Sequence, residues 1–123
     1  MTKFLLVFVG GGLGAMSRYV FQTLLAGKLG NFPIGTLTVN IVGSFFMGIF
    51  AGIFIGKLSG SSELFRVFFA VGFLGGFSTL SSFSIETLTL FQNGNIFSAL
   101  LNIIATFSTG IIACAAGFML MRN

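Results

Sequence analysis

Long apolar runs alternate with short polar breaks along the whole chain. The runs cover about residues 4–25, 35–56, 64–91 and 96–121. The breaks between them are rich in glycine, asparagine and serine, which favour turns. A helix needs about 20 mostly apolar residues to span a bilayer. The pattern therefore predicts a single transmembrane domain of four helices over residues 1–123, without a linker or a soluble appendage.

The composition also indicates a membrane protein. Of the 123 residues, 55% are hydrophobic and only 7% are charged, and the mean hydropathy is +1.08. A soluble domain carries about 25% charged residues. We therefore expect an all-α, multi-pass protein of the cell membrane, which in a bacterium is the plasma or inner membrane, with the lipid bilayer around it.

The few charges indicate topology rather than binding to nucleic acid. Six cations and two acids give a formal net charge of +4, too sparse for a nucleic-acid surface. With four spans, Lys28 marks one side of the membrane, and the other side holds the cations Lys3, Lys57, Arg66 and Arg122. The positive-inside rule then places both termini in the cytoplasm. Because the bias is small, two copies could insert in opposite orientations and pair antiparallel.

The residue inventory argues against an enzyme. The chain has no histidine, which excludes histidine-based acid–base and triad catalysis. Its single cysteine, Cys114, excludes an internal disulfide and a zinc site built on thiolates alone. Cys114 lies in an apolar run, where a free cysteine acts as a small packing residue.

Polar side chains inside the predicted spans are the functional candidates, because polar groups at membrane depth are expensive. On two spans they recur at intervals of four and so share a helix face. They are Thr36, Asn40 and Ser44 on the second span, and Asn102 and Thr106 on the fourth. On the first span, Arg18 either snorkels to the interface beside Tyr19 or provides a cation at the mouth of an anion path.

The third span contains the polar stretch GGFSTLSSFSIE, residues 75–86. Its glycine pair would permit a break near the middle of the helix, and irregular backbone at membrane depth is tolerated where it faces protein or a cavity. Carbonyls at such a break can coordinate a cation. Beyond the break one helix face would carry a ring and hydroxyls, from Leu80, Phe83, Ser84 and Thr87.

These groups are almost all neutral hydrogen-bond donors, and the only acid among them is Glu86. A proton-coupled pump would need a titratable group at its centre. A pathway for a small hydrated anion would instead need donors that replace water, and a phenylalanine ring edge is electropositive. The residues therefore favour an anion path lined by donors, without naming the anion.

Three longer motifs carry a family resemblance over nearly the whole chain. They are GGLGAMSRY at residues 11–19, GTLTVNIVGSFFMG at 35–48 and GFLGGFSTLSSFSIE at 72–86. Together they resemble the Fluc family of fluoride channels, also called CrcB. The resemblance implies an antiparallel, dual-topology dimer with two pores. It also implies passive, selective efflux of fluoride from the cytoplasm, which would relieve fluoride toxicity because HF enters, ionises and accumulates.

The resemblance also implies a set of site residues. A structural sodium ion at the dimer centre would be held by backbone carbonyls of Gly75 and Ser78. Arg18 and Glu86 would serve a vestibule or a structural role. Combined with the helix-face argument, the expected fluoride pathway comprises Thr36, Asn40, Leu80, Ser81, Ser82, Phe83, Ser84 and Thr106.

Three residues depart from the family pattern. Leu80 stands where the family has its first pore phenylalanine, Ser78 replaces threonine, and Asn102 stands where many members have tyrosine. A heterodimer with a paralogous subunit is therefore an alternative, although Asn40 and Phe83 favour a homodimer. A small four-span, proton-coupled multidrug exporter is a further alternative, but that class carries a glutamate on its first span and this chain has no acid there.

Overall fold

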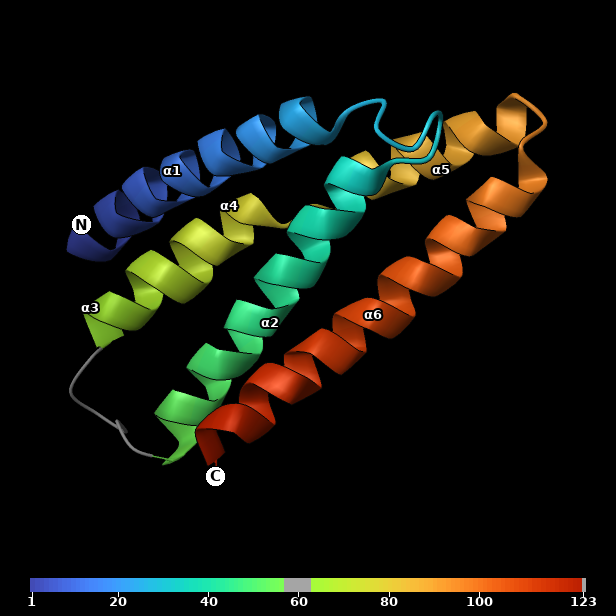
Figure 1. Ribbon diagram of the computed structural model, residues 1–123. Coiled ribbons are helices and arrows are strands. Elements are labelled where there is room, and N and C mark those ends of the chain that lie inside the picture. Colours follow the sequence, from blue (N-terminus) through green and yellow to red (C-terminus); the bar gives the residue numbers. More distant parts are fainter. Residues whose placement is uncertain (57–62, 123) are drawn as a thin grey trace.

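The computed structural model describes residues 1–56 and 63–122, which are almost entirely helical (Figure 1). Four helical stretches within this part of the chain are long and apolar enough to cross a membrane. The elements are α1 (Thr2–Leu25), α2 (Ile34–Gly56), α3 (Glu63–Arg66), the π-helix η1 (Val67–Leu74), α4 (Gly75–Phe77), α5 (Leu80–Gln92) and α6 (Ile96–Arg122). The predicted class, an all-helical protein with four candidate spans, is confirmed.

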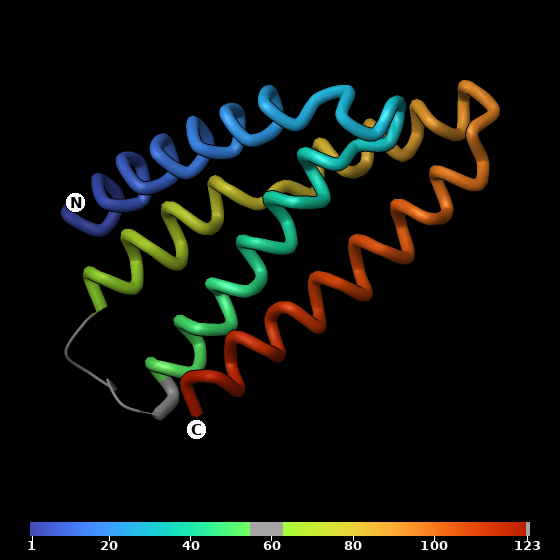
Figure 2. The backbone as a smooth tube through the Cα atoms, viewed as in Figure 1, coloured from blue at the N-terminus to red at the C-terminus, as the bar shows by residue number. Residues whose placement is uncertain are grey.

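The third candidate span, Glu63–Gln92, is built from several segments. Between α4 and α5 the backbone is extended, with φ −83° and ψ 156° at Ser78 and φ −151° and ψ 123° at Thr79. The tube in Figure 2 shows this straight step between two helical stretches. The structure differs from the sequence-based expectation in where the step lies, because Gly75 is still helical.

The second glycine of the pair, Gly76, has a packing role. A Cβ atom on Gly76 would collide with backbone atoms of Gly11 in α1. The same kind of contact runs along the rest of this helix pair, since Gly10 and Gly14 lie against the backbone of Phe68 and Phe73. Glycines let helix backbones approach closely in lipid. They therefore hold the first half of the third span tightly against α1.

The helices α2 and α6 form a second close pair, lying together at their C-terminal ends and separating towards the start of each helix (Figure 1). A Cβ on Gly48 would collide with the Cys114 carbonyl oxygen, and a Cβ on Gly117 would collide with that of Phe45. Because backbone atoms cannot move aside, only glycine fits at either position. The free thiol of Cys114 lies beside this contact, partly buried, consistent with a packing role.

The charged ends of the helices are gathered as the topology requires. One end of the molecule holds the start of α1, the short helix α3 and the C-terminal ends of α2 and α6 (Figure 1). The loop that contains Lys28 lies at the opposite end. Lys3 Nζ and Glu63 Oε1 are 2.7 Å apart there, with both side chains more than half exposed. An exposed pair of this kind contributes little stability. Lys57, assigned to the same side, lies outside the described residues.

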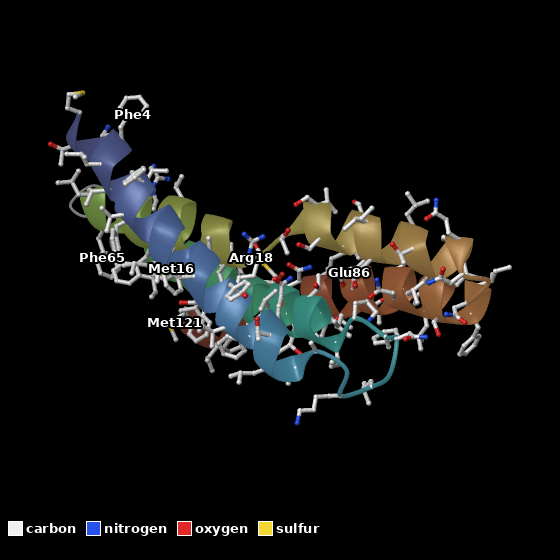
Figure 3. The ribbon with its side chains drawn as sticks, turned by 90° about the horizontal axis from the view of Figure 1, so that it is seen from above. Phe4, Met16, Arg18, Phe65, Glu86 and Met121 are labelled. Carbon is white, nitrogen blue, oxygen red and sulfur yellow. The ribbon has the colours of Figure 1, made fainter. Side chains whose placement is uncertain are left out.

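The outer surface is strongly apolar. Phe4 and Phe8 of α1 are each 79% exposed, and Ile111 of α6 is 69% exposed. Figure 3 shows Phe4 projecting from the end of α1, away from the other helices. Side chains of this kind suit contact with lipid rather than water. The protein is therefore a multi-pass membrane protein.

The packing of α2 on α6 predicts that Gly48→Ala will lower the stability of the protein by about 1–3 kcal/mol, because the added methyl meets backbone. Thermal unfolding in detergent measures the change. Gly12→Ala is the matched control, since a Cβ at Gly12 meets nothing within 4 Å. Equal behaviour of the two variants would contradict the assigned packing.

Candidate functional site

The central feature of the site is a pair of hydrogen bonds between Asn40 of α2 and the backbone of Thr79. The Asn40 Nδ2 donates to the Thr79 carbonyl oxygen at 3.0 Å, and the Thr79 N–H donates to Asn40 Oδ1 at 2.7 Å. The two bonds also define the orientation of the amide, since only this one provides a donor and an acceptor in the right places. Asn40 thus replaces the helix partners that extended backbone lacks.

These bonds change which carbonyls are free. In a continuous α-helix the N–H of residue i donates to the carbonyl of residue i−4. The Thr79 N–H donates to Asn40 rather than to Gly75, and the Ser82 N–H donates to Thr79 Oγ1 at 3.2 Å rather than to Ser78. The carbonyls of Gly75 and Ser78 have therefore lost their usual donors at the depth of the membrane.

A groove of about 350 Å³ adjoins this step in the backbone. Residues of α2, the α4–α5 step, α5 and α6 line it: Asn40, Ser44, Ser78, Thr79, Leu80, Phe83, Thr106, Phe107, Gly110 and Ile111. None of these described lining residues is charged. The groove thus offers neutral hydroxyl and amide groups on an otherwise apolar wall.

Two aromatic rings lie in the wall of this groove. The Phe83 and Phe107 rings meet edge to face, with centroids 5.6 Å apart and an angle of 85° between their planes. This geometry directs the electropositive edge of one ring to the face of the other. Phe83 is itself buried, whereas Leu80, one turn earlier, is 66% exposed.

A second polar cluster joins three helices. Gln22 Nε2 of α1 donates to Thr36 Oγ1 of α2 at 2.9 Å, and Thr36 Oγ1 donates to Glu86 Oε1 of α5 at 2.6 Å. Within the described part of the chain, the other carboxylate oxygen, Oε2, is buried without a hydrogen-bond partner. Two smaller cavities, of about 260 and 230 Å³, both reach Glu86.

Comparison with known proteins bears on the identity of this site. The family described as "CrcB-like protein, Camphor Resistance (CrcB)" matches residues 5–118. The chain belongs to the CrcB family. A protein of Coxiella burnetii named fluoride-specific ion channel FluC is 43% identical over 120 residues, which are 97% of both chains. Proteins of the same name from a Sulfurihydrogenibium species and from Pyrococcus abyssi are 43% and 41% identical.

These relatives match the chain almost completely. The Sulfurihydrogenibium protein is matched over 99% of this chain and 98% of its own, and the Pyrococcus protein over 97% and 95%. The family resemblance inferred from the three motifs is therefore confirmed. The site is therefore that of a CrcB family member.

The structure brings together only some of the residues that the sequence grouped. Asn40, Leu80, Phe83 and Thr106 share the groove. Thr36 lies apart, in the cluster with Glu86. The three serines of α5 do not line the groove and belong to the first turns of the helix. Their contacts are local: Ser81 Oγ is 3.2 Å from Thr79 Oγ1, the Ser82 N–H donates to Thr79 Oγ1, and Ser84 Oγ donates to the Leu80 carbonyl.

Arg18 lies on the face of α1 that packs against the third span. It follows Gly14 by one turn and precedes Phe21, whose ring meets the Phe77 ring edge-on at 5.7 Å. Figure 3 shows Arg18 near the middle of the molecule, whereas Glu86, a residue of α5, lies further towards the other end. The side chain is partly exposed, so the vestibule and structural interpretations both remain predictions.

Sequence reasoning missed several residues of the site, among them Thr79, Gln22 and the groove residue Phe107. Thr79 caps α5 and pairs with Asn40, and a threonine three residues before Ser82 at the start of a helix is a recognisable N-cap signal. Gln22 had no such signal, because its partner Thr36 lies on another helix.

The paired hydrogen bonds predict that Asn40→Asp will destabilise the protein by about 2 kcal/mol or more, because a carboxylate oxygen would face the Thr79 carbonyl. Thermal unfolding in detergent provides the measurement. Asn93→Asp, at the exposed end of α5, is the matched control and should change stability by less than about 0.5 kcal/mol. A stable Asn40→Asp variant would refute the pairing.

Proposed function

We propose that this protein is a fluoride-selective ion channel, which lets fluoride leave the cytoplasm passively and so relieves fluoride toxicity. The observation that carries the proposal is the uncharged groove of hydroxyls, amide and aromatic rings beside extended backbone in a membrane span. The relatives named fluoride-specific ion channels, over 40% identical along nearly the whole chain, support the choice of ion.

The chemistry of the groove suits a small anion. An anion that leaves water needs hydrogen-bond donors, and Asn40 has a second Nδ2–H beyond the one that it gives to Thr79. The hydroxyl of Ser44 adds a further donor to the wall. A lysine or arginine in this place would bind the ion tightly, whereas conduction requires binding weak enough for release.

The exporter alternative has less support. A proton-coupled exporter of the type considered needs a carboxylate on the first span, and α1 contains no acidic residue. The acid at membrane depth is Glu86 of α5, and one of its oxygens accepts a hydrogen bond from Thr36.

A second copy of the chain would complete the site, as an antiparallel dual-topology dimer. A mostly apolar groove of about 480 Å³ supports this arrangement, since its lining includes Met47, Phe50, Val71 and Gly75, with Arg66 as its one charged residue among those described. Gly75 is exposed although it lies at the middle of a span. The retained Asn40 and Phe83 favour two identical copies, so the chain should work without a paralogous subunit.

A structural sodium ion at the centre of that dimer fits the carbonyls present. The carbonyls of Gly75 and Ser78 are among those at the step that have lost their helical donors. Carbonyl oxygens freed at a helix interruption are typical ligands for sodium in membrane proteins. Two carbonyls from each copy would hold the ion and would tie the two backbones together.

The channel proposal predicts that liposomes containing the purified chain alone will release fluoride quickly and chloride hardly at all. Ion-selective electrodes measure both, and protein-free liposomes set the background. Equal release of the two ions would refute selectivity. No release of either ion would show that the chain alone is not the channel, and co-expression with a paralogue would then test the heterodimer.

The sodium proposal predicts that dialysis against sodium-free, potassium-containing buffer will dissociate the dimer and reduce fluoride efflux, and that added sodium will restore both. Size-exclusion chromatography and the efflux assay give the two readouts. Replacing sodium at constant ionic strength is the control. A dimer and a flux indifferent to sodium would rule out the ion.

A further inference from the structure

Behind the wall of the groove lies a buried hydrogen-bond network centred on Asn102 of α6. The Asn102 side chain is only 1% exposed and is not among the residues that line the groove. Its Nδ2 donates to Thr87 Oγ1 of α5 at 2.9 Å, and Thr87 Oγ1 donates to the Phe83 carbonyl oxygen at 2.7 Å. Thr106 Oγ1 donates to Asn102 Oδ1 at 3.4 Å.

The donor and acceptor of each hydrogen bond in this network can be assigned by starting from the Phe83 carbonyl oxygen, the acceptor at its end. The Phe83 carbonyl can only accept, so Thr87 uses its one proton there. The group of Asn102 that faces Thr87 is therefore its N–H, and its carbonyl oxygen faces Thr106. All three donors are thus used within the network.

The direction of these hydrogen bonds has a consequence for Thr106, which does line the groove. A hydroxyl has a single proton, and that of Thr106 is directed to Asn102. The groove then meets only its lone pairs, which repel an anion. To donate to an ion in the groove, Thr106 must break its hydrogen bond to Asn102. The buried Asn102 Oδ1 is then left without its donor.

The cost of that exchange is moderate. A strong O–H···O bond measures about 2.5–3.0 Å, so the 3.4 Å contact is the weakest bond of the network. Leaving a buried acceptor unpaired nevertheless carries a desolvation penalty. Asn102 and an anion in the groove thus compete for one proton.

We propose that Asn102 is a positioning residue, which keeps the hold of Thr106 on the transported anion weak by competing for its hydroxyl proton. The inference rests on the proposed channel function. Weak binding favours rapid release, because an ion that is held at each polar group cannot leave quickly. Asn102 acts through Thr106 and touches no ion itself.

The test measures fluoride efflux from liposomes as a function of fluoride concentration. Asn102→Leu removes the competing acceptor, and Thr87 keeps its bond to the Phe83 carbonyl. The fluoride concentration for half-maximal efflux should fall roughly threefold to tenfold, the effect of about one hydrogen bond, and the maximal rate should fall too. In a Thr106→Val background, Asn102→Leu should have no such effect.

The control is Thr89→Val, since the described hydrogen bond of the Thr89 hydroxyl stays within α5, to the Ile85 carbonyl at 2.8 Å. The half-maximal fluoride concentration of this variant should equal that of the unaltered chain. Asn102→Ala removes the same acceptor and replaces Asn102→Leu if leucine prevents folding. A half-maximal concentration unchanged by both variants would overturn the inference. So would a shift that persists in the Thr106→Val background, or a Thr106→Val variant with unaltered concentration dependence. An unaltered chain that passes no fluoride would instead refute the proposed function.

Discussion

The structure depends on satisfying the backbone polar groups of two residues that are not helical inside a membrane. In hydrocarbon an unpaired N–H or carbonyl costs several kcal/mol, so extended backbone there needs a partner from the protein. Asn40 provides both partners for Thr79 with one amide group. Without that side chain, the Thr79 N–H and carbonyl would lose these partners at membrane depth.

Glycines outside the extended step hold the helices around it in close contact. Gly10, Gly14 and Gly76 bring α1 and the first half of the third span into backbone contact, and Gly48 and Gly117 do the same for α2 and α6. Each half of the third span is thus held by a different neighbour, since α5 leans on α6 through Thr87 and Asn102. The two halves can then be offset from one another while both remain packed.

The sequence predicted the parts of this structure that depend on local pattern. Four apolar runs were sufficient for four helices, and spacing by four residues placed Asn40 and Ser44 on one face. It predicted a break at the glycine pair, whereas Gly75 and Gly76 are helical and the backbone becomes extended only at Ser78. The contact of Gly76 with α1 is a tertiary contact, which no local pattern reveals. The sequence also grouped Thr36 with the groove, although its bond to Glu86 depends on how α2 crosses α5.

The start of α5 has an electrostatic consequence for the groove. A helix that begins inside the membrane presents its N-terminal N–H groups there, equivalent to about half a positive charge. Leu80, the first residue of α5, lines the groove, so this partial charge acts beside it in a medium of low dielectric constant. The field belongs to the backbone and cannot be removed by deprotonation. The start of α5 therefore contributes an attraction for anions that does not depend on pH and needs no ionised side chain in the wall.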